Sequence, residues 1–163
     1  KTMKWLWRVT GWLAWWCAWP AMWLYLRDSQ RTRVLLSRKG GSDVLVVKGW
    51  LSANDRWEFP GVGLHKGEAP LHGLLREVRE EIGLELEPKQ VQPLMTSQVK
   101  SKGFRFNLHI YTASLSGTPT LKLQRFEIAS AEWVDYHNLT VSNAEPDVLL
   151  AVQAWSGSSA LLQ

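Results

Sequence analysis

Four glutamates, Glu68, Glu77, Glu80 and Glu81, lie within a short stretch of this 163-residue chain. On a helix, spacings of three and four residues bring the last three side chains within an arc of about 100°. Carboxylates at that spacing repel one another, and a divalent cation held between them removes the repulsion. Carboxylate oxygens are the ligands that Mg²⁺ and Mn²⁺ prefer. The spacing therefore indicates a metal site; the alternative is a solvated acidic helix face.

Two neighbouring segments would position these glutamates. The stretch PGVGLHKGE, which ends at Glu68, is rich in glycine, so its backbone can turn sharply and approach a ligand closely. Residues 69–84 carry apolar side chains at helical spacing, and Gly83 is a natural helix stop. Arg76 precedes Glu80 by four residues and could hold that carboxylate by an ion pair. Loop and helix together predict a pocket for a metal and a phosphate.

The rest of the body alternates strand and helix patterns. The runs RVLLS and DVLVVKGWL flank RKGGS and predict a hairpin with a glycine turn. VQPLMTSQV and FRFNLHIYTA predict two further strands, and AEWVDYHNL predicts a strand that runs into a turn. EPDVLLAVQAW predicts a terminal helix whose inner side carries Leu149, Leu150 and Val152. The body is therefore expected to be a mixed α/β domain.

The first 27 residues differ from the body. They hold seven of the eleven tryptophans, and Val9 to Leu26 contains no charged residue. As a helix this stretch would be roughly 27 Å long, close to the thickness of a bilayer core. We therefore expect residues 1–27 to be a hydrophobic, anchor-like helix that contacts membrane lipid through residues 5–26, and residues 28–163 to be the second domain. The flanking charges do not fix its orientation. Two alternatives stay open: a cleaved signal peptide, or a helix that packs on protein in water.

Charge and cysteine content narrow the function classes. The net charge is +4, and the basic residues are scattered, so the composition gives no support for binding a nucleic acid polymer. The single cysteine, Cys17, excludes an intrachain disulfide, and no Cys/His cluster has zinc spacing.

The acidic helix and its loop resemble the Nudix box, G-x(5)-E-x(7)-R-E-U-x-E-E-x-G-U, where U is aliphatic. Eight of its nine defined positions match, and they are Glu68, Arg76, Glu77, Val78, Glu80, Glu81, Gly83 and Leu84. The first glycine of the box falls on Val62, which still offers the backbone carbonyl that commonly binds metal in this family. The stretch WEFPG before the loop also resembles Nudix hydrolases, and the resemblance extends over roughly residues 32–156.

Resemblance to MutT-like Nudix hydrolases implies an α/β/α sandwich with a mixed sheet and a metal-dependent attack of water on a phosphoanhydride. It implies Mg²⁺ or Mn²⁺ as cofactor and a nucleoside diphosphate linked to another group as substrate. The implied metal ligands are Glu77, Glu80 and Glu81, with Glu68 and the Val62 carbonyl in support. Arg76 would orient the helix carboxylates. Glu127 resembles a downstream glutamate that serves some members as ligand or base; which glutamate is the base stays open between Glu80 and Glu127.

Other residues and the setting of the domain are predicted less directly. Lys48 and Arg56 could meet phosphate oxygens, and Asn143 could contact a base, each by resemblance to relatives. The anchor-like helix implies a membrane-associated enzyme with its domain in the cytoplasm, and a soluble cytoplasmic protein is the alternative. A homodimer is compatible with the sequence. A rival hypothesis is a silent domain that binds a nucleotide without cleaving it and signals through the membrane helix.

Overall fold

The computed structural model describes residues 29–38, 41–50, 55–61, 63–101, 104–124 and 126–160. The predicted membrane helix at residues 5–26 lies outside these ranges, and so does Val62. Within the described ranges, no helix is both long enough and apolar enough to cross a bilayer. The anchor-like helix and the domain boundary at residue 28 thus stay predictions.

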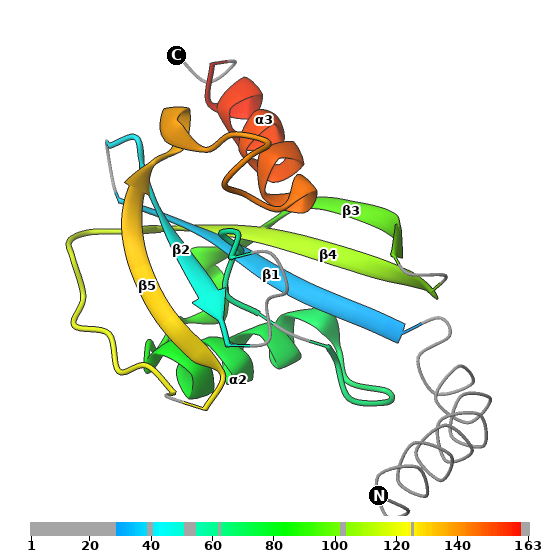
Figure 1. The fold of residues 1–163 in the computed structure, drawn as a ribbon. Coiled ribbons are helices and arrows are strands. Elements are labelled where there is room, and N and C mark those ends of the chain that lie inside the picture. The colour runs from blue at the N-terminus through cyan, green and yellow to red at the C-terminus, as the bar shows by residue number, and fades with distance from the viewer. Residues whose placement is uncertain are drawn as a thin grey trace, which may run out of the picture.

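Five strands form one mixed sheet in the order β3-β4-β1-β2-β5 (Figure 1). Their bounds are Ser29–Arg38 for β1, Asp43–Gly49 for β2, Val91–Ser101 for β3, Phe104–Leu115 for β4 and Ile128–Asp135 for β5. The central pair, β1 and β4, is parallel, while the other three pairs are antiparallel. The predicted hairpin is confirmed by the antiparallel pairing of β1 with β2 across the glycine turn.

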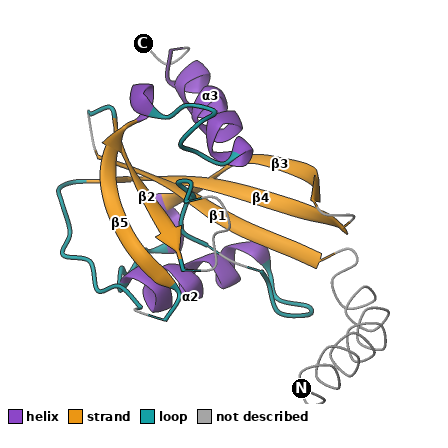
Figure 2. Cartoon of the chain, in the orientation of Figure 1, coloured by secondary structure: helices purple, strands orange, loops and turns teal. Residues whose placement is uncertain are grey.

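The helices cover the sheet from opposite faces (Figure 2). α2 spans Pro70–Ile82 on one face and α3 spans Pro146–Ala160 on the other, and two short 3-10 helices occupy Pro88–Gln90 and Tyr136–Asn138. The predicted α/β/α sandwich with a mixed sheet is confirmed. The two faces hold separate apolar clusters, which include Leu35, Val46 and Val148 under α3 and Val34, Leu45 and Val78 under α2.

The central strands explain why a sandwich forms. Four consecutive residues of β1 and four of β2 are buried, and all of them except the polar Ser37 contribute alternately to the two clusters. A strand that is apolar on both sides can be satisfied only where each face is covered, here by a helix.

Both helices are confirmed, but the prediction of which residues of the second helix are buried was partly wrong. α2 ends at Gly83, whose φ of 69° is the left-handed conformation that closes a helix at low cost for glycine. In α3 the buried face is formed by Val148, Ala151 and Val152, whereas Leu150 is 51% exposed. Helical spacing from Val148 reaches residues 151 and 152 and leaves residue 150 on the solvent side.

Candidate functional site

The loop before α2 is fixed to the sheet by backbone contacts. Glu58 exchanges two backbone hydrogen bonds with Val47 of β2, and the side chain of Phe59 is fully buried. Gly61 then passes so close to β1 that an added Cβ would lie 2.2 Å from the Thr32 carbonyl oxygen, and its φ is +130°. Only glycine fits this passage without strain. The result is that the Gly61 N–H points at α2 and donates to Glu81 Oε2 at 3.0 Å.

The acidic residues of α2 lie along the edge of its buried face. Leu74, Val78 and Ile82 are fully buried in the core, and Glu77 and Glu81 are the buried carboxylates beside them, 8% and 5% exposed. The Glu80 side chain is about half exposed. Carboxylates near a helix C-terminus lie at the negative end of the helix dipole, so α2 itself gives them no stabilisation.

Arg76 connects most of the acidic residues. Its Nε and Nη2 atoms each donate to Glu68 at 2.9 Å, which is a bidentate ion pair. Its Nη1 atom donates to Glu77 and, at 3.2 Å, to Glu80, so the predicted ion pair between Arg76 and Glu80 is confirmed. One guanidinium therefore orients three carboxylates, two from the helix and one from the loop.

The loop carboxylate is held in its charged form. Arg76 and the backbone N–H of His65 together lower the pKa of Glu68 to about 2. Gly73 permits this placement, since an added Cβ there would lie 3.0 Å from Glu68 Oε2 and 2.2 Å from the Leu64 side chain. Gly73 thus allows the loop to pack closely against α2.

The pKa values of the buried helix carboxylates are shifted in the opposite direction. Burial, together with the nearby Glu77 and Glu127, raises the pKa of Glu81 to about 7, against the Gly61 N–H and Arg33, which lower it. Burial also raises the pKa of Glu77, although Arg76 opposes the shift. At a pH at which these carboxylates are ionised, the site therefore contains more negative charge than Arg76 alone neutralises.

This charge imbalance fits a divalent cation, because all the donors are hard oxygens in a partly buried position. In the described part of the chain, no three His, Cys, Asp or Glu side chains already stand together as a ligand set. The reason is that Arg76 and the Gly61 N–H engage the carboxylates. The predicted ligand set is therefore compatible with the site by its chemistry and stays a prediction.

The raised pKa of Glu81 leads to a pH dependence of stability. Below pH 4.5 both folded and unfolded chains bind the Glu81 proton, and between about pH 4.5 and pH 7 only the folded chain keeps it. Stability therefore falls as pH rises through this window. In EDTA, we expect the Glu81 contribution to fall by on the order of 3 kcal/mol between pH 4.5 and 8.

Urea unfolding of the wild type and of Glu81→Gln across this pH range measures the effect. The glutamine variant removes the titrating group, so the difference in unfolding free energy between the two proteins should change with pH and level off above pH 7. Two parallel pH profiles would contradict the assignment.

Glu127 lies near this cluster, since its charge acts on both Glu77 and Glu81. The segment that carries it is tied to the end of α2. Lys122 and Gln124 donate backbone hydrogen bonds to the carbonyls of Ile82 and Glu81, at 2.9 and 2.8 Å, and Glu127 N donates to the Gln124 carbonyl. The connection between β4 and β5 therefore brings Glu127 close to α2, the helix that carries the Nudix box residues.

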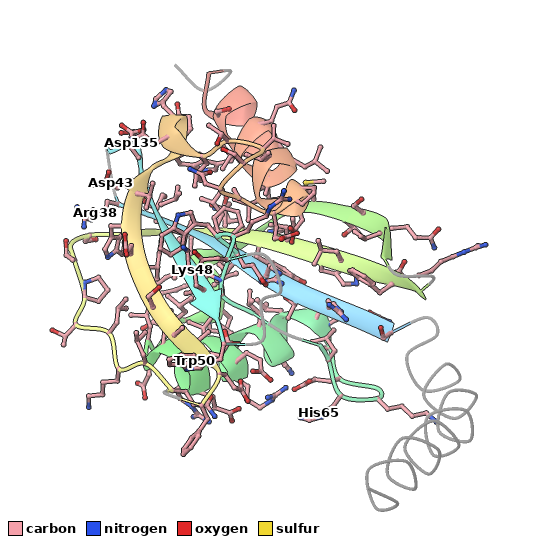
Figure 3. All side chains as sticks on the ribbon, in the orientation of Figure 1. Arg38, Asp43, Lys48, Trp50, His65 and Asp135 are labelled. Atoms are coloured by element: carbon pink, nitrogen blue, oxygen red, sulfur yellow. The ribbon has the colours of Figure 1, made fainter. Side chains whose placement is uncertain are left out.

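The predicted substrate-binding residues have other partners. Lys48, on β2 (Figure 3), pairs with Asp55 at 2.9 Å and lies 4.4 Å above the Trp57 ring. The Asn143 amide caps a turn, where it donates to the Asn138 carbonyl and accepts from the Thr140 N–H. Arg56 is partly buried. Their contacts with substrate stay predictions.

The sequence analysis missed two features of this region. One is the hydrogen bond from the Gly61 N–H to Glu81. The sequence shows a glycine in this loop, but the direction of its N–H depends on how closely the loop passes β1. The other is Arg33, which pairs with Glu58 at 2.6 Å and with Asp147 of α3 at 3.4 Å. These partners are distant in the sequence, so no local spacing could reveal them.

Comparison with known proteins places this geometry in a family. The chain matches the NUDIX domain over residues 28–152. It is 59% identical over 29 residues to an RNA pyrophosphohydrolase of Nitratiruptor sp., which is 18% of this chain and 19% of that protein. It is 47% identical over 38 residues to an RNA pyrophosphohydrolase of Acinetobacter baylyi, 23% of each. The chain thus matches only about a fifth of the length of these curated relatives.

Solved structures share the fold over most of their length. The solution structure of the E. coli ORF135 protein gives a TM-score of 0.65 at 22% identity, covering 84% of this chain and 94% of that one. A MutT NUDIX hydrolase from Burkholderia pseudomallei gives 0.64 at 16% identity, covering 78% and 98%. A C. elegans Ap4A hydrolase in a binary complex gives 0.66 at 15% identity, covering 82% and 98%.

Proposed function

The chain belongs to the NUDIX domain family, and on that premise we propose that it hydrolyses the phosphoanhydride bond of a nucleoside diphosphate linked to a further group, using a divalent cation. One observation carries the proposal. Arg76 braces three glutamates at the edge of α2, while the buried Glu77 and Glu81 beside it leave negative charge that a cation would neutralise.

The roles follow from the positions of the residues. Glu77, Glu80 and Glu81 would hold Mg²⁺ or Mn²⁺, with Glu68 and the Val62 carbonyl as further oxygen donors. The bound cation would lower the repulsion between a diphosphate and incoming water. Arg76 orients Glu77 and Glu80, and hydrogen bonds with Glu68 and Glu77 raise its own pKa. Glu80 and Glu127 are the two candidates for taking the proton of the attacking water.

Phosphate contacts would come from the basic residues on the sheet side. Lys48 and Arg56 are proposed to bind phosphate oxygens, for which Lys48 would have to leave Asp55. Asn143 is proposed as a base contact, although its amide is already engaged in a turn. The second group of the substrate is left open. Two curated relatives are named RNA pyrophosphohydrolases, so the 5′ end of an RNA is a candidate beside small nucleotides.

A substrate panel tests the proposal. Nucleoside triphosphates, dinucleoside polyphosphates, nucleotide sugars and a 5′-triphosphorylated RNA are incubated with the protein in Mg²⁺ or Mn²⁺, and the nucleotide products are measured together with released phosphate and pyrophosphate. We expect turnover of at least one class, loss of turnover in EDTA, and recovery on adding the metal. No turnover of any compound with either metal would reject the enzyme and favour the nucleotide-binding sensor.

The setting of the enzyme also stays a proposal. Residues 1–27 would tether the NUDIX domain of residues 28–163 to a membrane through residues 5–26, with the domain in the cytoplasm. This rests on the apolar, tryptophan-rich sequence of that stretch. A tether would raise the local concentration of a substrate that is itself at the bilayer, such as a nucleotide-linked lipid. A homodimer stays compatible with the sequence.

A further inference from the structure

Two aromatic side chains are largely exposed at one end of the sheet. Trp50 is 66% and Phe126 is 91% exposed. Among the side chains that the structure describes, the other large apolar residues with most of their surface in water are the aliphatic Val141 and Leu150. Exposed large rings are unfavourable in water and are commonly found where a protein binds a ligand or partner.

The two rings belong to neighbouring chain segments. Trp50 directly follows β2 (Figure 3), and its N–H donates to the Glu127 carbonyl at 3.1 Å. Phe126 is the residue before Glu127, at the start of β5. Gly49 is paired with Ile128, so the same end of the β2–β5 ladder carries both aromatic residues.

This end of the sheet adjoins the carboxylate cluster. Gln124, two residues before Phe126, donates its N–H to the carbonyl of Glu81 itself at 2.8 Å. Glu127 directly follows Phe126, its carbonyl accepts the Trp50 backbone N–H, and its charge is one of the causes that raise the pKa of Glu77 and Glu81. The segments that carry the two aromatic residues therefore adjoin the end of α2, where the proposed function requires the phosphates.

We propose that Trp50 and Phe126 stack on the base of the substrate while its diphosphate lies at the α2 carboxylates. This inference rests on the proposed function and names the side chains that would bind the base of its nucleoside diphosphate substrate. Ring-on-base stacking accepts any base, because every base has a π face, and it contributes roughly a 5- to 100-fold gain in affinity per base. The base can belong to a free nucleotide or to the 5′ end of an RNA.

Binding of non-hydrolysable analogues tests this independently of turnover. Adenosine and uridine 5′-(α,β-methylene)diphosphate carry a base, and methylenediphosphonate is the matched compound without one. Their affinities for the full chain are measured by calorimetry in Mg²⁺. Trp50→Leu and Phe126→Leu keep apolar bulk and remove the ring, Trp50→Phe and Phe126→Tyr keep a ring, and Val141→Ala is the control for an exposed apolar residue elsewhere.

Each leucine variant should lose roughly 5- to 100-fold in affinity for both nucleoside analogues and bind methylenediphosphonate like the wild type. The ring-keeping variants and Val141→Ala should bind both classes like the wild type. A 5′-triphosphorylated oligoribonucleotide that binds more tightly than the mononucleotides, with the same loss in the leucine variants, would identify RNA as the source of the base.

Other results would overturn the inference. These are a wild type with no base-dependent affinity, equal losses for compounds with and without a base, or leucine variants that change self-association in sedimentation without changing nucleotide affinity. If analogue binding follows the expected pattern but no substrate in the panel is hydrolysed, the proposed hydrolysis fails and the aromatic base site stands.

Discussion

Glu81→Gln is expected to lower kcat at least about 100-fold in saturating Mg²⁺, because it removes a charged ligand of the proposed cation and leaves only a neutral amide oxygen. The substitution keeps the size of the side chain, and the amide oxygen can still accept the hydrogen bond from the Gly61 N–H. The loss should therefore appear in the chemical step and not in folding. Formation of the nucleotide product under single-turnover conditions measures it, once the substrate panel has supplied a substrate.

Stability separates this result from simple unfolding. Because burial raises the pKa of Glu81 to about 7, the metal-free wild type carries a destabilising negative charge at pH 8 that the glutamine variant lacks. Glu81→Gln should accordingly unfold at an equal or higher urea concentration than the wild type in EDTA at pH 8. Glu85→Gln, an exposed position just beyond α2, is the matched control and should keep wild-type turnover. An active Glu81→Gln enzyme would remove this glutamate from the ligand set.

Gly61→Ala is expected to lower the free energy of unfolding by roughly 3 kcal/mol or more. The new Cβ would lie 2.2 Å from the Thr32 carbonyl oxygen and 2.8 Å from the Arg33 Cα, both backbone atoms of the central strand. At a φ of +130°, alanine adds conformational strain on the order of 1–3 kcal/mol before any overlap is counted. Relieving the overlap would push the loop away from β1 and withdraw the Gly61 N–H from Glu81.

Two nearby glycines serve as controls that separate the steric overlap from the conformational strain. Gly63→Ala meets no heavy atom within 4 Å at an ordinary φ, so it should change stability little. Gly67→Ala also has open space, but its φ is +80°, so it should show the conformational cost alone, about 1–2 kcal/mol. Urea unfolding at constant slope ranks the three variants. A Gly61→Ala protein as stable as Gly63→Ala would show that the loop can move without cost.

The sequence predicted those parts of the fold that depend on local periodicity. The α2 helix and its end at Gly83, the β1–β2 hairpin and the sandwich class follow from spacing that a few neighbouring residues carry. The burial of Leu150 was predicted wrongly, because an apolar residue was assigned to the core without fixing where α3 begins. One residue of helix rotation is about 100°, which is enough to exchange inside for outside.

In the candidate site, too, the features that depend on local spacing could be predicted and those that depend on long-range contacts could not. Arg76, Glu77, Glu80 and Glu81 are neighbours on one helix, so the ion pair between Arg76 and Glu80 could be predicted. The burial of Glu77 and Glu81, which raises the pKa of both, depends on the sheet beneath them. The ionic contacts of Arg33 with Glu58 and Asp147 join three distant segments. Long-range contacts of this kind have no signature in a single sequence.

The connection between β4 and β5 tolerates change unevenly along its length. From Lys122 onward its backbone is hydrogen-bonded to the last turn of α2, whereas Gly117 has open space around it. Residues inserted near Gly117 would lengthen an exposed part of the loop and leave Glu127 in place. The same insertion between Lys122 and Glu127 would shift the glutamate out of register with the helix. Insertions are therefore expected to be tolerated in the first half of this connection and not in its second half.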